Sequence, residues 1–325
     1  MPDPQDLKIK PEQQPRPEDV SYDLDRALSS LIGLRSQIPA DAFTARTLGT
    51  ERAGNGVIIS KDGLVATVGY LITEAESVWL LDERGRATPA HVVAYDQETG
   101  FGLVQALGRL DLPHLELGSS ADLPVGEAVV VAGHGGRRMA TKANVVAKKE
   151  FAGYWEYVLD EGIFTSPAHP NWGGTALIGP DGTLRGIGSL YVQQTSEGGP
   201  PEDGNLVVPI DLLKSIMGDM TQFGRVNKAP RPWLGMLTAE IDNRLVVAGI
   251  NDGTPADKAD VRVGDIVLGV AGQPVTQLAQ MFRSIWSLGA AGVVVPLTVL
   301  REGGSVEINI HSASRRDFLK SPSLH

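Results

Sequence analysis

The chain has 325 residues, of which 42% are hydrophobic, and this supplies enough apolar side chain for two packed domains. Its formal net charge of −10, with no basic cluster larger than Arg137-Arg138, argues against nucleic acid and anionic membranes as partners. The 38 Gly and 21 Pro, together with short clusters of β-branched residues, favour many strands joined by tight turns.

The sequence has no cysteine and no long apolar run. These two features bear on whether the protein has disulfides, a metal site or a membrane span. Without Cys there is no disulfide or thiolate site, and the six His have no metal-binding spacing, so we expect neither a metal nor a cofactor. The first 20 residues lack a signal-peptide core, and no later run is long enough to span a bilayer. We therefore expect a soluble cytoplasmic protein, or a periplasmic one if a leader has been removed.

The N-terminal two thirds of the chain has the pattern of β-barrels. Residues 1–21, rich in Pro, Gln and charge, predict a mobile tail. Beyond them, apolar segments alternate with turn residues such as Lys61-Asp62-Gly63 and Pro180-Asp181-Gly182. Strands are predicted within residues 28–34, 56–60, 64–72, 77–82, 91–96, 101–107, 127–133, 141–151, 175–179, 184–193 and 205–209.

A helix is predicted directly after Pro209, which suits a first helical turn. Its apolar residues recur at helical spacing, at Leu212, Leu213, Ile216, Met217 and Met220. This helix closes a first predicted domain of residues 22–222. Residues 223–231 mix Gly, Pro and basic residues, which is typical of a linker.

A second, smaller domain is predicted for residues 232–316, with residues 317–325 as a C-terminal tail. A polar turn is expected at Thr254-Pro255-Ala256, and a helix near 276–288, with Gly289 at its end. The apolar face of this helix comprises Leu278, Met281, Phe282, Ile285 and Trp286. Strands are predicted at 233–241, 244–250, 265–272, 293–302 and 305–311.

Three segments of the first domain resemble the HtrA family of serine proteases. Residues 54–72, GNGVIISKDGLVATVGYLI, are similar to the stretch that carries the family's catalytic His. Residues 96–107, DQETGFGLVQAL, resemble the stretch that holds the catalytic Asp. Residues 168–189, AHPNWGGTALIGPDGTLRGIGS, resemble the N-P-G-N-S-G-G-P-L block around the nucleophilic Ser.

The resemblance continues into the second domain and covers roughly residues 28–310. Residues 207–226, followed by RPWLGM at 231–236, are similar to the helix, linker and PDZ start of the same family. The resemblance implies a mainly β fold, with a trypsin-like double β-barrel followed by a PDZ domain.

The three catalytic positions of the family are occupied here by Tyr70, Gly100 and Trp172. Peptide hydrolysis needs a hydroxyl nucleophile, an imidazole base and a carboxylate that orients it, and these residues supply none of them. The Tyr phenol stays protonated near neutral pH, and the Trp indole would occupy the place of the scissile carbonyl. We therefore expect a pseudoprotease.

Part of the catalytic architecture is retained around Trp172. Asn171, Gly173 and Gly174 keep a Gly-rich turn whose N–H groups can form an oxyanion hole, although the glycines are also explained by a tight turn alone. Thr175 replaces the family's usual Pro.

Two alternative functions remain open. The chain is an active serine endopeptidase if another set of residues, such as Ser166 with His169 or His134, performs the chemistry. Alternatively it is a regulatory subunit of an active HtrA-type paralogue, since the family commonly forms trimers.

The PDZ-like loop WLGM is the binding motif that the sequence retains. In PDZ domains such a loop directs backbone N–H groups at the C-terminal carboxylate of a peptide, which adds as a strand. The predicted peptide-binding residues are Trp233, Leu234, Gly235, Met236, Met281 and Ile285. Arg231 adds a favourable charge, or else is a solvated linker residue, and Trp233 and Leu234 can equally be core residues. The expected partners are peptide or protein C-termini.

Overall fold

The computed structural model describes residues 8–195 and 201–320, which divide into two units. The first unit contains the described residues up to Lys149, together with Glu161–Val226 and Lys320. The second contains Glu150–Asp160 and Asn227–Leu319. The segment Glu150–Asp160 therefore belongs with the C-terminal unit, although its neighbours in the chain belong to the first.

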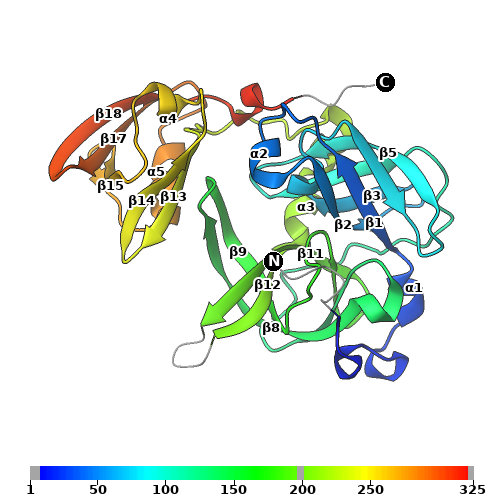
Figure 1. Cartoon of the computed structure of the whole chain (residues 1–325). Helices are drawn as coiled ribbons and strands as arrows, with labels where there is room; N and C mark the ends of the chain where they lie inside the picture. The colour runs from blue at the N-terminus through cyan, green and yellow to red at the C-terminus, as the bar shows by residue number, and fades with distance from the viewer. Residues whose placement is uncertain (1–7, 196–200, 321–325) are drawn as a thin grey trace. The chain divides into compact units, whose positions relative to one another are not determined.

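The first unit holds two closed six-stranded barrels, as expected for a trypsin-like fold (Figure 1). The first barrel has the strand order β1-β2-β3-β6-β5-β4. Its strands are β1 (Leu31–Gln37), β2 (Glu51–Ile58), β3 (Leu64–Val68), β4 (Ser77–Leu81), β5 (Ala87–Tyr95) and β6 (Phe101–Ala106). Two short helices accompany it, α1 (Leu24–Leu28) and α2 (Ala45–Leu48).

The second barrel has the order β10-β11-β12-β9-β8-β7. Its strands are β7 (Ala128–Ala132), β8 (Ala140–Gly153), β9 (Tyr157–Ser166), β10 (Ala176–Ile178), β11 (Leu184–Thr195) and β12 (Pro201–Pro209). Its core shows the period of two that points alternate strand residues to one face, as with Val129 and Val131 on β7 and Ala143 and Val145 on β8. Closure into barrels leaves no unpaired sheet edge to cover.

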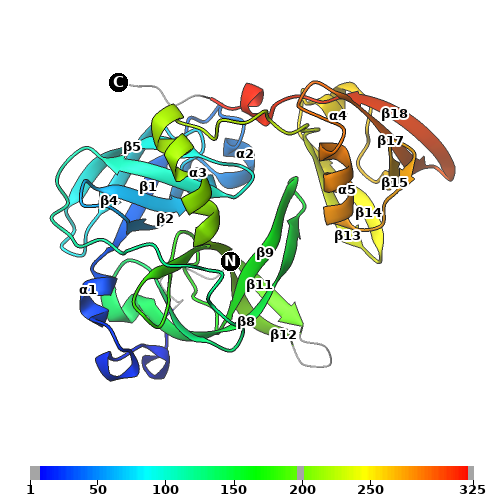
Figure 2. The same cartoon turned by 180° about the vertical axis from the view of Figure 1, so that it is seen from behind.

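The helix predicted after Pro209 is α3 (Ile210–Phe223), which contacts β5 of one barrel and β11 of the other (Figure 2). It buries Ile210, Leu213 and Met220 of its apolar stripe. Gly224 ends it in the left-handed conformation, with φ of 64°.

The N-terminal segment differs from the expected mobile tail. Residues 1–7 lie outside the described residues, but two short 3₁₀ helices follow, η1 (Pro11–Gln13) and η2 (Pro17–Asp19). Ile9 is buried, and Asp19 forms an ion pair with Lys142 of β8. One buried apolar side chain and the fixed φ of several Pro are enough to order this polar segment.

The second unit contains a sheet of order β13-β14-β15-β17-β18, with β16 paired to β15. The strands are β13 (Met236–Ile241), β14 (Arg244–Ile250), β15 (Ile266–Val270), β16 (Gln273–Pro274), β17 (Val294–Arg301) and β18 (Gly304–His311). The predicted helix is α5 (Leu278–Trp286), with five of its residues buried in the core. The expected turn at Thr254-Pro255-Ala256 is instead a short helix, α4 (Pro255–Lys258), because Pro is favourable at a first helical position.

The predicted C-terminal tail also begins with structure. The 3₁₀ helix η5 (Arg315–Phe318) places the Phe318 ring 5.0 Å from that of Trp233. Residues 321–325 of the predicted tail lie outside the described residues.

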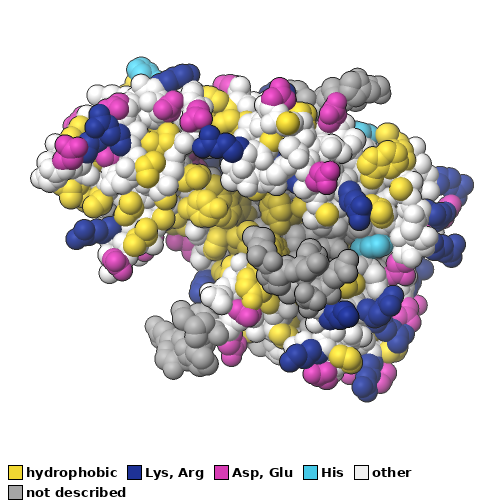
Figure 3. All heavy atoms as spheres, viewed as in Figure 1, with side chains coloured by type: hydrophobic (Ala, Val, Ile, Leu, Met, Phe, Trp, Pro, Cys, Tyr) yellow, Lys and Arg dark blue, Asp and Glu magenta, His cyan; other side chains and the backbone are white. Residues whose placement is uncertain are grey.

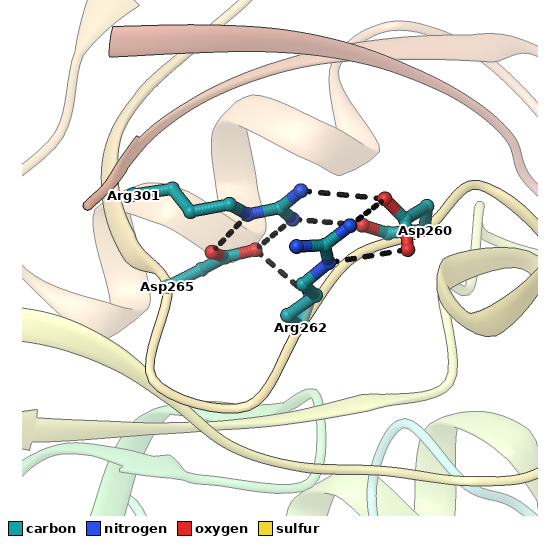
Figure 4. A network of polar contacts seen from close by, with 4 residues as sticks. All are labelled: Asp260, Arg262, Asp265 and Arg301. Carbon is teal, nitrogen blue, oxygen red and sulfur yellow. Dashed lines mark hydrogen bonds and ion pairs between the residues drawn. The ribbon is translucent and has the colours of Figure 1, made fainter. Parts of the chain in front are cut away.

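A buried ion pair joins two strands of the second unit (Figure 4). The Asp265 carboxylate, 2% exposed, accepts from Nε and Nη2 of Arg301 at 2.8 and 2.7 Å and from the N–H of Arg262 at 2.9 Å. Burial opposes ionisation of Asp265, but the hydrogen bonds from Arg301 and Arg262 outweigh it and hold the pKa below its ordinary value. The exposed Asp260 pairs with Arg262 and extends the network.

On the face shown in Figure 3, Lys and Arg side chains are interspersed with Asp and Glu over both units. On this face the basic side chains do not gather into a broad patch. Within the described residues, no helix combines the length and hydropathy required to cross a bilayer.

Candidate functional site

The first candidate site surrounds Tyr70 in the 3₁₀ helix η3 (Gly69–Leu71), which directly follows β3. The Tyr70 hydroxyl donates to the Ser189 carbonyl on β11 at 2.9 Å, which links the two barrels. The Trp172 indole also hydrogen-bonds the Tyr70 side chain, and its ring lies 5.6 Å from that of Tyr191. Tyr70 and Trp172, 102 positions apart, therefore touch.

Gly100 lies beside them, in the turn that leads into β6. Its carbonyl accepts from the N–H of Gly69 at 2.7 Å, and its N–H donates to the Asp96 carbonyl at 2.9 Å. Its φ of 85° is in the left-handed region that favours Gly. The structure thus brings all three degenerate positions together at the junction of the two barrels.

Neither Tyr70 nor Asp96, four positions before Gly100, is placed to act in place of the family's catalytic groups. Burial raises the pKa of the Tyr70 phenol further above its ordinary value, although the hydrogen bond from Trp172 opposes this shift. The Asp96 carboxylate accepts from both the N–H and the hydroxyl of Thr99 at 2.8 Å, so it is held within its own turn. Neither of these two side chains is therefore available as a general base at neutral pH.

The Gly-rich turn around Trp172 is held against the first barrel by Asn55. The Asn55 side-chain amide donates to the carbonyls of Asn171 and Gly173, at 2.9 and 3.0 Å, and its backbone N–H donates to the Gly173 carbonyl at 2.9 Å. Gly174 has φ of 79°, and a Cβ there would lie 1.9 Å from the Asn55 carbonyl oxygen. The tight-turn explanation of the glycines therefore has a direct structural basis.

Pro170 is a further departure that the sequence analysis missed. In a trypsin-like oxyanion hole the donors are the N–H of the nucleophile and that of the residue two positions before it. Those positions are Trp172 and Pro170 here, and Pro has no N–H. A Pro in place of the family's Gly was the signal that could have revealed this loss.

The alternative pair of Ser166 and His169 is not hydrogen-bonded together. His169 is buried, its Nδ1 accepts from the N–H of Asn171 at 3.1 Å, and its Nε2 lies 3.0 Å from the Met139 carbonyl. Burial lowers the pKa of His169 to about 4, so the ring is neutral. The Ser166 hydroxyl donates to the Asp203 carbonyl at 3.2 Å. Both nitrogens of His169 are thus used in fixing the turn.

His134 also has a structural position. Its backbone N–H donates to Oδ1 of Asn55 at 2.9 Å. Its imidazole lies against Gly33 of β1, where a Cβ would come within 3.2 Å of Nδ1.

Within residues 8–195 and 201–320, no group of His, Asp or Glu is arranged to hold a metal ion.

The second candidate site is the loop that precedes β13, Trp233–Met236. The side chains of Trp233, Leu234 and Met236 are buried, and Trp233 forms paired backbone hydrogen bonds with Ala313. The carbonyls of Leu234 and Gly235 accept from the N–H groups of Ala256 and Asn251 at 2.8 and 3.1 Å. The side chains of this loop are therefore core residues, and its backbone N–H groups carry the binding chemistry.

The N–H groups of this loop have a partner within the same unit. Gly235 donates to Oε1 of Glu156 at 2.9 Å, and Leu234 donates to both carboxylate oxygens at 3.2 Å. Glu156 is buried, and Arg315 is a charged group that acts on it. Neither Glu156 nor Arg315 was identifiable from the sequence, because nothing in the local sequence signals a contact between residues so far apart in the chain.

The remaining predicted peptide-binding residues lie next to this loop. Met281 and Ile285 on α5 are buried in the same apolar cluster as Met236, and Val158 belongs to that cluster too. Arg231 lies over the Trp286 ring, with its guanidinium carbon 4.3 Å from the ring centroid. This cation–π contact differs from both earlier interpretations of Arg231.

Comparison with protein families supports the two-domain organisation. Residues 54–187 match the trypsin-like peptidase domain, and residues 232–311 match the PDZ domain.

Curated relatives of this chain are named as serine endoproteases. A "Probable periplasmic serine endoprotease DegP-like" of Pseudomonas fluorescens is 29% identical over 282 residues, which is 81% of this chain and 57% of the relative. A protein of the same name from Chlamydia pneumoniae is 25% identical over 275 residues, 79% of this chain and 54% of the relative. The chain spans little more than half the length of these relatives.

Solved structures show the same fold. The HtrA-type protease AlgW with a tripeptide superposes with a TM-score of 0.52 at 20% identity, over 92% of this chain and 97% of AlgW. A serine endoprotease of Yersinia pestis gives a TM-score of 0.51 at 20% identity, over 90% and 98% of the two chains. The chain therefore has a trypsin-like peptidase domain followed by a PDZ domain, and its fold is similar to that of HtrA-type proteases.

Proposed function

We propose that the chain is a pseudoprotease that binds peptide or protein C-termini through its PDZ domain and does not hydrolyse them. The observation that carries this proposal is the presence of Tyr70 and Trp172 in place of the base and nucleophile, with the Tyr70 hydroxyl bound to the Ser189 carbonyl. Pro170 supports it independently, because it removes one N–H from the oxyanion position. A nucleophile, a base, an orienting carboxylate and one oxyanion donor are thus all lacking.

The binding half of the proposal rests on the loop Trp233–Met236. Its N–H groups are arranged to receive a carboxylate, as the contacts with Glu156 illustrate. Structures of AlgW with a tripeptide and with a decapeptide give peptide binding as a property of a similar protein. We infer the same ligand class for this chain, and assembly with itself or with active HtrA-type proteins is a further part of the proposal.

The cellular compartment follows the relatives rather than the first expectation. Curated relatives are named as periplasmic, which favours the periplasmic alternative over a cytoplasmic location. We therefore include a periplasmic location in the proposed function.

Labelling with a fluorescent fluorophosphonate, together with cleavage of unfolded casein, tests the loss of catalysis. We expect no label on the chain and no cleavage, because no residue at the site is an activated hydroxyl nucleophile. An active trypsin-like protease in the same reaction is the positive control. Stoichiometric labelling, or cleavage that co-purifies with the chain and stops when it is labelled, would establish the endopeptidase alternative instead.

A further inference from the structure

The carboxylate-binding loop already holds a carboxylate from the same chain. Glu156 lies in the turn between β8 and β9, yet it accepts hydrogen bonds from Leu234 and Gly235, 78 and 79 positions later. Two N–H groups converge on one carboxylate, which is the arrangement a PDZ domain uses for a peptide terminus. Glu156 also has φ of 61°, a conformation that a residue other than Gly adopts only when its surroundings hold it.

The backbone beside Glu156 also follows the pattern of a bound peptide. The N–H of Thr238 on β13 donates to the Tyr154 carbonyl at 3.0 Å. Tyr154 stands two residues before the residue that carries the carboxylate, and Thr238 stands two residues after Met236 at the end of the loop. One backbone hydrogen bond therefore joins the turn Tyr154–Glu156 to β13, the edge strand to which a peptide adds in a PDZ domain.

Two further contacts secure the segment Glu150–Asp160. Val158 is buried in the apolar cluster that contains Met281 and Ile285. Arg283 of α5 pairs with Glu150 and Asp160, at the two ends of the segment, each at 2.5 Å. These exposed ion pairs add little energy individually, but they anchor the segment at both ends. An apolar side chain of the segment thus packs in the cluster that contains two of the predicted peptide-binding residues.

We propose that Glu156 acts as an internal ligand of the PDZ loop, so that an external C-terminus binds only by displacing the segment Glu150–Asp160. The inference rests on the proposed role of the loop Trp233–Met236 in peptide binding. It also specifies the ligand. A competing peptide needs a free terminal carboxylate, and an aromatic pair before it matches Tyr154 and Trp155 of the segment.

The charge on Glu156 makes this contact one that a ligand can displace. Burial raises the pKa of the Glu156 carboxyl to about 7, although the N–H groups of Gly235 and Leu234 and the charge of Arg315 act in the opposite direction. The buried carboxylate is therefore less favourable than its hydrogen bonds alone suggest. A peptide terminus, which ionises more readily, competes for the same donors.

The experiment compares the full chain with its Glu156→Ala variant, using a fluorescein-labelled peptide that ends in Gly-Tyr-Trp-Val with a free carboxylate. Fluorescence anisotropy should show at least tenfold tighter binding to the variant, because the competing carboxylate is gone. Amide hydrogen exchange at Leu234 and Gly235 should be faster in the variant without peptide. Glu156→Gln, which keeps an acceptor oxygen, should lie between the two.

Asp160→Asn is the matched control, since it removes a carboxylate of the same segment that contacts Arg283 and not the loop. It should leave both the peptide affinity and the exchange rates close to those of the unaltered chain. Equal peptide affinity for the chain and Glu156→Ala, or unchanged exchange at Leu234 and Gly235, would overturn the internal-ligand inference. Faster exchange in Glu156→Ala without any peptide binding would instead refute the proposed peptide-binding function.

Discussion

Restoring the three catalytic residues should not be sufficient to restore proteolysis. We expect the variant Tyr70→His, Gly100→Asp, Trp172→Ser to remain at least 10²-fold to 10³-fold below an equivalent enzyme with an intact oxyanion hole. Pro170 causes this deficit, since losing one oxyanion donor costs about 3 to 4 kcal/mol of transition-state stabilisation. The variant should also be less stable, because Asp at a position with φ of 85° is strained by about 1 kcal/mol.

Adding Pro170→Gly to the triple variant is the decisive step. The added N–H should raise kcat for a fluorogenic casein by roughly 10² to 10³, and fluorophosphonate labelling should become detectable. Tyr70→His also removes the hydrogen bond to Ser189, which frees the histidine ring for its role as base. The control is the same quadruple variant with Ala at position 172, which has no nucleophile. Equal rates in the triple and quadruple variants would refute the role given to Pro170.

Three further predictions concern titration and stability. The pKa of Glu156, about 7 when docked against 4.5 when free, means that the docked state binds its proton more tightly. Docking should therefore weaken as pH rises from about 4.5 to 7, by up to about 3 kcal/mol, and hydrogen exchange of its segment should speed up accordingly. Gly174→Ala should lower the free energy of unfolding by about 3 kcal/mol or more in chemical denaturation, since its Cβ would clash with backbone. Arg301→Met should lower the free energy of unfolding by leaving the Asp265 carboxylate without its ion-pair partner. Because the pKa of Asp265 is depressed, this loss should be present above pH 4 and should shrink as pH falls further.

Matched variants separate these effects from general destabilisation. Glu156→Gln should remove the pH dependence of protection, measured as the exchange rate relative to the intrinsic amide rate at the same pH. Gly126→Ala has a similar positive φ of 92° with no atom within 4 Å of the added Cβ, so it should cost only about 1 kcal/mol. Arg262→Met removes an exposed ion pair and should change stability by less than about 1 kcal/mol. A Gly174→Ala variant as stable as Gly126→Ala would contradict the predicted clash with the Asn55 backbone. Docking of the segment Glu150–Asp160 that does not change with pH would contradict the role of Glu156 titration. An Arg301→Met variant as stable as the unaltered chain would contradict the stabilising role of the Asp265 ion pair.

The sequence predicted the mainly β architecture because strand patterns depend on residues two positions apart. Val129 and Val131, for example, predict a strand whatever strands it pairs with. The helices after Pro209 and at 278–286 were equally visible, since Leu213 and Met220 or Met281 and Ile285 recur at helical spacing. The sequence did not distinguish a turn at Pro255 from the short helix α4, because Pro is favourable both in a turn and at the first position of a helix.

The spacing of motifs predicted that Tyr70, Gly100 and Trp172 occupy the family's three catalytic positions. What Tyr70 does there was not predictable, because its acceptor Ser189 lies 119 positions away and belongs to the other barrel. Pro170 could have been interpreted from the sequence alone, since a missing N–H is a property of the residue itself.

The sequence by itself predicted most of the strands and the two longest helices, but not β9 (Tyr157–Ser166). It also predicted that Tyr70, Gly100 and Trp172 replace the family's catalytic residues and that a PDZ-type loop follows. Only the tertiary structure decided that Glu156, in the turn between β8 and β9, binds the N–H groups of the loop Trp233–Met236. Local periodicity shows only which neighbouring residues share a face of a strand or helix. The contact of Glu156 with two N–H groups 78 and 79 positions later depends on how the chain between them folds.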